Sequence, residues 1–213
     1  MGHAITINHT LYCEAIQVIK DEPQKEYSCS GTPVDCVKIA INKILKRKPD
    51  LCVSGINHGS NSSINVIYSG TMSAAVEAGT QGIAAIGFSL LDYSIEADFK
   101  PSEKFIKSIV SQCLSNKMPN GVVLNVNIPK LSENKIKGIK ICRQANGHWE
   151  EKFDKRTNPL GRDYYWLTGT FVNNDKGEDT DEWALENGYV SVTPTQYDLT
   201  AHHAIKDINN WEL

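Results

Sequence analysis

The sequence lacks a long apolar run, a basic cluster and a cysteine-pair motif. No uninterrupted apolar run approaches the roughly 20 residues that cross a bilayer. The opening letters, "MGHAITINHT", show no basic segment followed by an apolar one. The formal charge of -3 is spread along the 213 residues, so no region offers the basic surface that neutralises nucleic-acid phosphates. We therefore expect no membrane span, no export and no nucleic-acid polymer as a partner.

The spacing of the cysteines indicates the redox environment. Six are scattered without a C-x-x-C pair, and several lie in apolar periodic segments: Cys13, Cys29, Cys36, Cys52, Cys113 and Cys142. This distribution favours buried free thiols over a disulfide framework or a zinc site. We therefore expect a protein of the cytoplasm, and its 40% apolar content is sufficient for a sizeable core.

Strand-like and helix-like patterns alternate along the first part of the chain. The expected elements are a strand at 3–13, a helix at 32–48, a strand at 51–55, a helix at 70–78, a strand at 83–90, a helix at 102–116 and a strand at 121–129. Thr32 is a suitable N-cap and Pro33 a suitable first residue for the first helix, whose last turn would hold Lys46, Arg47 and Lys48. Such alternation requires crossover connections, and it predicts an α/β fold with a parallel sheet flanked by helices.

The pattern changes after residue 129. "IKGIKICRQA" and "DYYWLTGTFV" are typical of longer strands, so residues 130–174 are expected to form an appended β arm or hairpin. The aromatic residues Tyr164, Tyr165 and Trp166 would pack there against a partner subunit. A short helix and a strand then follow in residues 179–202. We expect an α/β core at 1–129 and a region used in oligomerisation at 130–213.

The stretch "SGINHGSN" follows the strand at 51–55, at the edge of the sheet where open α/β sheets bind ligands. Gly55 and Gly59 permit sharp turns and close approach of a ligand, and Asn61 belongs to the same loop. Asn57 offers a neutral oxygen to a hard cation such as magnesium or manganese. The alternative is that Asn57 only occupies a left-handed turn position.

The stretch "YSGTMSAAVEAG" restarts the chain as a helix. Ser69, Gly70 and Thr71 lie at its positive end, where unpaired amide hydrogens form an anion site suited to phosphate. The alternative is that Ser69 and Thr71 serve only as N-caps. The glycine spacing matches neither a dinucleotide fingerprint nor a P-loop. The two features together after one strand nevertheless favour a pocket for phosphate and metal.

The block "DLCVSGINHGSNSSINVIYSGTMSAAVEAGTQGIAAIGFSL" resembles the signature of the SurE survival-protein family. "SGTPVDCVKIAIN", "VLNVNIP", "RDYYWLTG" and "DTDEWALENGYVSVTPTQYDLTAH" follow in the family's order, so the resemblance covers nearly the whole chain. It implies a cytoplasmic, metal-dependent 5'-nucleotidase acting on nucleoside monophosphates. It also implies a Rossmann-like core and an arm that builds homodimers or homotetramers.

The resemblance also implies site residues. Members of the family hold a divalent metal through an N-terminal Asn-Asp-Asp-Gly motif, a serine and the asparagine that corresponds to Asn57. The Ser69-Gly70-Thr71 turn corresponds to the helix start beside the substrate phosphate. Neither the residues of the loop nor the resemblance assigns a general base.

This sequence departs from the family in its acidic residues. It contains no Asp-Asp pair, and its adjacent acidic pairs are expected in helix or surface contexts away from the loop: Asp21-Glu22, Glu150-Glu151, Glu178-Asp179 and Asp181-Glu182. One neutral oxygen binds a hard cation weakly. We therefore expect a truncated sequence, in which Met1 is an internal methionine and the 213 residues alone have little phosphatase activity. The alternative is a non-catalytic α/β subunit that oligomerises and binds a phosphorylated ligand.

Overall fold

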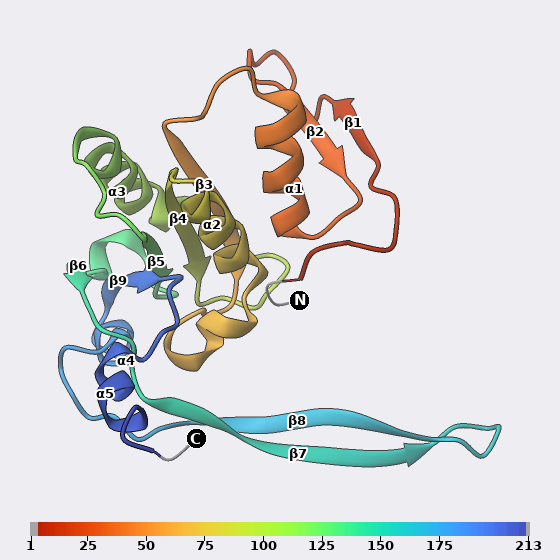
Figure 1. The fold of residues 1–213 in the computed structure, drawn as a ribbon, viewed down its shortest axis with the longest axis vertical. Helices are drawn as coiled ribbons and strands as arrows, with labels where there is room; N and C mark the ends of the chain where they lie inside the picture. Colours follow the sequence, from red (N-terminus) through yellow and green to blue (C-terminus); the bar gives the residue numbers. More distant parts are fainter. Residues whose placement is uncertain (1–3, 212–213) are drawn as a thin grey trace.

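The fold is built on one five-stranded sheet with helices on both faces (Figure 1). The computed structural model describes residues 4–211. The strand order is β3-β4-β5-β9-β6, with β3 at Leu51–His58, β4 at Ala84–Leu90, β5 at Val122–Ile128, β9 at Tyr189–Gln196 and β6 at Gly138–Ile141. Neighbouring strands are parallel except for β5 and β9. The predicted α/β fold with a mostly parallel sheet is confirmed.

The core lies on both sides of β4 and β5. The helices are α1 (Pro33–Ile39), α2 (Gly70–Thr80), α3 (Glu103–Ser115), α4 (Asp181–Glu186) and α5 (Ile205–Ile208). Phe88 of β4 joins Phe105 of α3 in one apolar cluster, whereas Ala85, an odd-numbered position of the same strand, joins Met72 of α2 in another. This is the alternation of a strand that is buried on both faces. Gly87 permits the approach of α2, because a Cβ there would lie 2.4 Å from Met72 Sδ.

The helix predicted at 32–48 begins as expected but ends early. Thr32 is the N-cap, Asp35 completes a capping box, and Pro33 lies in the first turn. The helix continues as a π-helix to Ile44, and Leu45 then adopts an extended backbone. The basic residues 46–48 therefore lie beyond the helix, and their predicted place in its last turn is wrong.

The strand predicted at 3–13 is also wrong for most of its length. The first strand, β1 (Cys13–Ile16), begins where the prediction ends and pairs with β2 (Glu26–Cys29). Side-chain bonds to α1 hold the preceding segment, because the Thr6 hydroxyl donates to Asp35 Oδ2 over 2.7 Å. The start of the predicted strand, His3, lies outside the described residues. Cys13 of this hairpin and Cys36 of α1 are exposed, contrary to the expectation of buried thiols.

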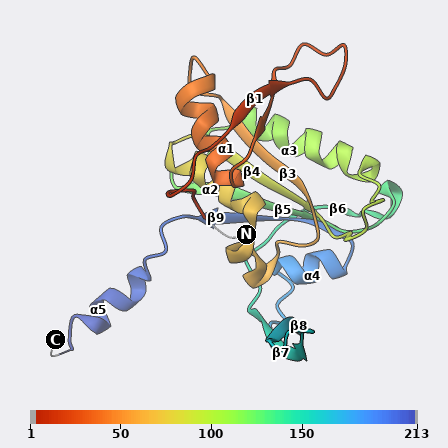
Figure 2. The same ribbon diagram turned by 90° about the vertical axis from the view of Figure 1, so that its right-hand side faces the viewer.

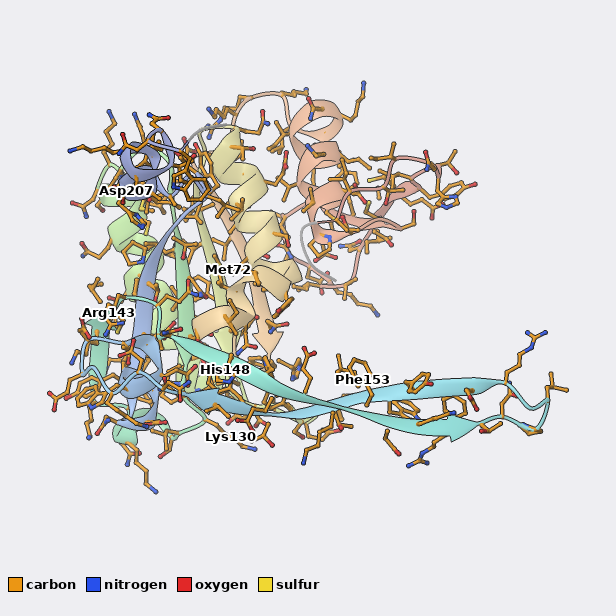
Figure 3. All side chains as sticks on the ribbon, turned by 60° about the horizontal axis from the view of Figure 1, so that its bottom comes forward. Met72, Lys130, Arg143, His148, Phe153 and Asp207 are labelled. Atoms are coloured by element: carbon orange, nitrogen blue, oxygen red, sulfur yellow. The ribbon has the colours of Figure 1, made fainter. Side chains whose placement is uncertain are left out.

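The predicted arm is present but shorter than expected. It consists of β7 (Gly147–Thr157) and β8 (Asp163–Asn173), which pair antiparallel along their whole length. Figure 1 shows it projecting from the sheet, and in Figure 3 His148 lies near the body while Phe153 lies farther out. Residues 138–141 instead form β6 of the main sheet, which therefore takes strands from both predicted regions. The division at residue 129 stays a prediction.

The C-terminal segment and one edge of the sheet lie away from the core. After β9 the chain leads away from the sheet to α5 (Figure 2). The sheet itself ends at β3, which pairs with β4 alone among the described strands and leaves Val53 50% exposed. Within residues 4–211, no helix combines the length and apolar character needed to cross a membrane.

Candidate functional site

Asn57 lies near the carboxyl end of β3, which runs three residues farther than the expected strand end at Gly55. The register with β4 shifts between Ser54 and Asn57. Gly55 has φ +117°, and a Cβ there would lie 2.4 Å from the Phe88 carbonyl oxygen. Gly59 has φ +89°. Both positions therefore need glycine, and they fix the backbone on either side of Asn57.

The Asn57 amide is oriented by one hydrogen bond. Its Nδ2 donates to the Gly59 carbonyl oxygen over 3.1 Å, and Oδ1 accepts no hydrogen bond from the described residues. The backbone of Asn57 is not left-handed, so the simple turn interpretation of this residue is wrong. The half-buried amide thus presents an oxygen that could ligate a cation.

The start of α2 has the features of an anion site. Ser69 is the N-cap, and its hydroxyl accepts a hydrogen bond from Met72 N over 3.0 Å. The N-cap interpretation therefore holds for Ser69. The N–H groups of Gly70 and Thr71 remain without intrahelical acceptors, and the first turn contains no acidic residue. The positive end of the helix is thus not neutralised by its own side chains.

Asn61 belongs to a buried amide network that holds the loop after β3. Its backbone N–H donates to Asn127 Oδ1 over 2.8 Å, and its Nδ2 donates to Ser89 Oγ over 2.6 Å. Asn125 Nδ2 donates in turn to the Asn61 carbonyl oxygen over 2.8 Å. The loop is thereby fixed to β4 and β5, so Asn61 has a positioning role at the sheet edge.

The acidic pair Asp181-Glu182 lies against the same loop, which corrects the expectation that it is remote. Asp181 is fully buried and accepts from Ser63 N over 2.8 Å and from Ala145 N over 2.9 Å. Glu182 accepts from the Ser62 hydroxyl. These partners are more than 100 positions apart in sequence, except for Ala145, so no local pattern could indicate them.

Asp181 joins three parts of the molecule. Its carboxylate accepts hydrogen bonds from the backbone N–H groups of Ser63 after the loop, Ala145 just before β7 and Glu182 in the first turn of α4. Ser63, at φ +51°, takes a left-handed conformation that is uncommon for a residue with a side chain. Burial raises the pKa of Asp181, and the backbone N–H groups of Ser63 and Ala145 act in the opposite direction.

The described residues do not form a complete metal site. No group of three or more His, Cys, Asp or Glu side chains suited to a metal occurs within residues 4–211. The oxygens of Asp181 are both used by backbone N–H groups. Asn57 Oδ1 therefore fits one position of a metal centre, and the carboxylates that such a centre requires are not supplied by this part of the chain.

Comparison with known proteins gives the relationship directly. The family described as "Survival protein SurE" matches residues 1–151. The chain belongs to the SurE family. A SurE relative named 5'-nucleotidase SurE, from Christiangramia forsetii, is 73% identical over all 213 residues, which cover 82% of that relative. Another with the same name, from Cytophaga hutchinsonii, is 58% identical over 215 aligned positions.

The SurE fold is also present among solved structures. The crystal structure of a SurE protein from Aquifex aeolicus superposes with a TM-score of 0.81 at 38% sequence identity. The alignment covers 98% of the present chain and 82% of the Aquifex chain. Family, sheet and arm thus agree with the resemblance drawn from the signature block. The polar network behind the loop is the part that sequence reasoning missed.

Proposed function

We propose that this SurE chain carries the phosphate-binding half of a metal-dependent 5'-nucleotidase. The observation that supports this most directly is that Asn57 and the start of α2 flank residues 59–69, which the hydrogen bonds of Asn61 fix to β4 and β5. The carboxyl edge of parallel strands is where α/β proteins bind ligands. The names of the relatives give the reaction class, hydrolysis of a nucleoside 5'-monophosphate.

The cation would be magnesium or manganese, ligated by Asn57 Oδ1 together with carboxylates. Such a metal, when bound, neutralises the phosphate and makes a water molecule more acidic. Because the 213 residues contain no Asp-Asp pair, this chain alone would hold the cation weakly and have little activity. This chain alone would then behave like the alternative, a non-catalytic α/β subunit that binds a phosphorylated ligand without hydrolysing it.

The residues of α2 would hold the phosphate. The free N–H groups of Gly70 and Thr71 would donate to phosphate oxygens, and the Thr71 hydroxyl could add a third bond. Ser69 would act by fixing the start of the helix. Donors held in place in this way stabilise charge that develops as the P–O bond breaks. No general base is assigned.

Assembly and location are further parts of the proposal. The arm exposes most of its aromatic side chains, including Trp166, which supports association into homodimers or homotetramers. The six cysteines occur as free thiols, which supports a cytoplasmic location.

The role of Asn57 can be tested in a longer chain that carries an Asn-Asp-Asp-Gly segment before Met1. Asn57→Ala should lower kcat/KM for a nucleoside monophosphate by about 100-fold, because a metal ligand is lost. Asn120→Ala removes an exposed amide from the turn before β5 and is the matched control. Equal activity of the two variants would remove Asn57 from the site.

A further inference from the structure

A hollow next to the proposed phosphate site is lined by two aromatic side chains. It has a volume of about 370 Å³ and is lined by Tyr68, Trp149, Glu151, Leu167, Thr168 and Gly169. Tyr68 is 59% exposed and Trp149 is 41% exposed, so both present ring surface to solvent. The volume lies within the range of small-molecule pockets.

The Trp149 ring is held in place despite its exposure. Its Nε1 donates to Asn65 Oδ1 over 2.8 Å. Phe171 packs against it edge to face, with ring centroids 5.7 Å apart. A ring that is fixed before binding loses little conformational entropy when a ligand stacks on it. The hollow therefore has a rigid aromatic wall.

Other lining residues suit a flat ring with polar edges. Gly169 is required by the pairing of β7 and β8, since a Cβ there would lie 2.7 Å from the Glu150 carbonyl oxygen. Glu151 can accept from an amino group, and the Thr168 hydroxyl, which donates to the Lys152 carbonyl oxygen, retains lone pairs. The chain supplies no basic group to this lining. The chemistry favours a neutral aromatic ligand over an anion.

The position of the hollow connects it to the phosphate site. Tyr68 directly precedes Ser69, the N-cap of α2, so one wall of the hollow is a single residue from the proposed phosphate donors. We propose that this hollow binds the base of the nucleoside monophosphate, stacked against Trp149 and Tyr68. The proposal rests on the proposed function for its choice of ligand. It adds the groups that distinguish a nucleotide from a simple phosphate ester.

The proposal can be tested by binding, without turnover, on the 213-residue chain. Adenosine 5'-monophosphate should quench tryptophan fluorescence, and ribose 5-phosphate, which lacks a base, should not. Trp149→Phe should abolish the quenching, whereas Trp166→Phe, on the exposed part of the arm, should retain it. Tyr68→Ala should raise the Kd for adenosine 5'-monophosphate by about tenfold through loss of stacking. Circular dichroism checks that each variant is folded.

Three results would overturn the proposal. These are quenching that survives in Trp149→Phe, equal quenching by ribose 5-phosphate, or no quenching of the unaltered chain at millimolar nucleotide. A signal from Trp149 that depends on protein concentration and not on nucleotide would instead assign the hollow to a second copy of the chain. Failure of the proposed hydrolysis is a separate result, because phosphate release is measured on the longer chain.

Discussion

The loop at the carboxyl edge of the sheet and the β7-β8 arm contrast in how their polar side chains are used. Around the loop, buried Asn127 and Asp181 accept from the backbone N–H groups of residues 61 and 63, and buried Asn61 donates to the Ser89 hydroxyl. Along the arm, nearly every side chain between Trp149 and Thr170 is exposed. The loop is therefore fixed by tertiary hydrogen bonds, and the arm depends on its own ladder.

This difference assigns different tasks to the two regions. A network with paired donors and acceptors specifies one conformation, as a binding site requires. An isolated two-stranded hairpin is only marginally stable in water, so the arm needs support at its base. Asp181 gives that support, because it holds both Ser63 beside the loop and Ala145 before β7.

The largest effect is expected when this shared support is removed. Asp181→Ala leaves the buried N–H groups of Ser63 and Ala145 without acceptors and should lower the free energy of unfolding by about 3 kcal/mol. Urea denaturation measures the change. The control Asp179→Ala removes an exposed carboxylate that pairs with Arg143, and should cost less than about 1 kcal/mol. Similar losses in both variants would contradict the special role of Asp181.

A smaller effect, dependent on pH, is expected from Asp35 of the body. Burial alone would raise the pKa of this carboxyl, but hydrogen bonds from Thr6 and Thr32 outweigh it and lower the pKa to about 2. Because the unfolded pKa is about 4, the stabilisation is complete above about pH 4 and is lost as the pH falls towards 2. Asp35→Asn should cost about 1.5 kcal/mol at neutral pH.

Acid unfolding of the Asp35→Asn variant checks the sign of this effect. The variant should lose less stability than the unaltered chain between about pH 4 and pH 2. Asp163 on the arm is the comparison, since its pKa is lowered by Lys155 and Thr157 while the side chain stays exposed. Asp163→Asn should leave the acid unfolding of the body unchanged. Parallel acid curves for the Asp35 variant and the unaltered chain would refute the assignment.

The smallest effect on stability is expected on the arm itself. Trp166 is 60% exposed, so Trp166→Ser should change the free energy of unfolding by less than about 0.5 kcal/mol. If the arm mediates association, the same variant should lower the oligomer mass measured by light scattering. An unchanged mass would exclude this residue from the subunit interface.

The elements that the sequence predicts correctly are those whose signals are local. Thr32 and Pro33 predict the start of α1, the apolar run 83–90 predicts β4, and Ser69 predicts the start of α2. Each depends on residues within one turn or one strand. The same local signals misplaced the end of the first helix, because the change to a π-helix before Leu45 has no composition of its own.

The buried polar network behind the loop could not be predicted, because it depends on contacts between residues that are far apart in the sequence. Asp181 and Glu182 read as ordinary first-turn acidic residues of α4, yet they bond to residues 62 and 63. Asn125 and Asn127 lie in an otherwise apolar strand, and their burial was a signal that polar partners must exist. Only the sheet order brings those partners together.

Asn57 and the start of α2 need metal-ligating carboxylates to complete a catalytic site, and residues 4–211 bring no such group of carboxylates together. The direct measurement is phosphate release from adenosine 5'-monophosphate with manganese present, by this chain and by a longer chain that carries an Asn-Asp-Asp-Gly segment. We expect turnover by the longer chain and none above background by the 213 residues. Clear turnover by the 213-residue chain would show that Asn57 and the start of α2 need no further carboxylates.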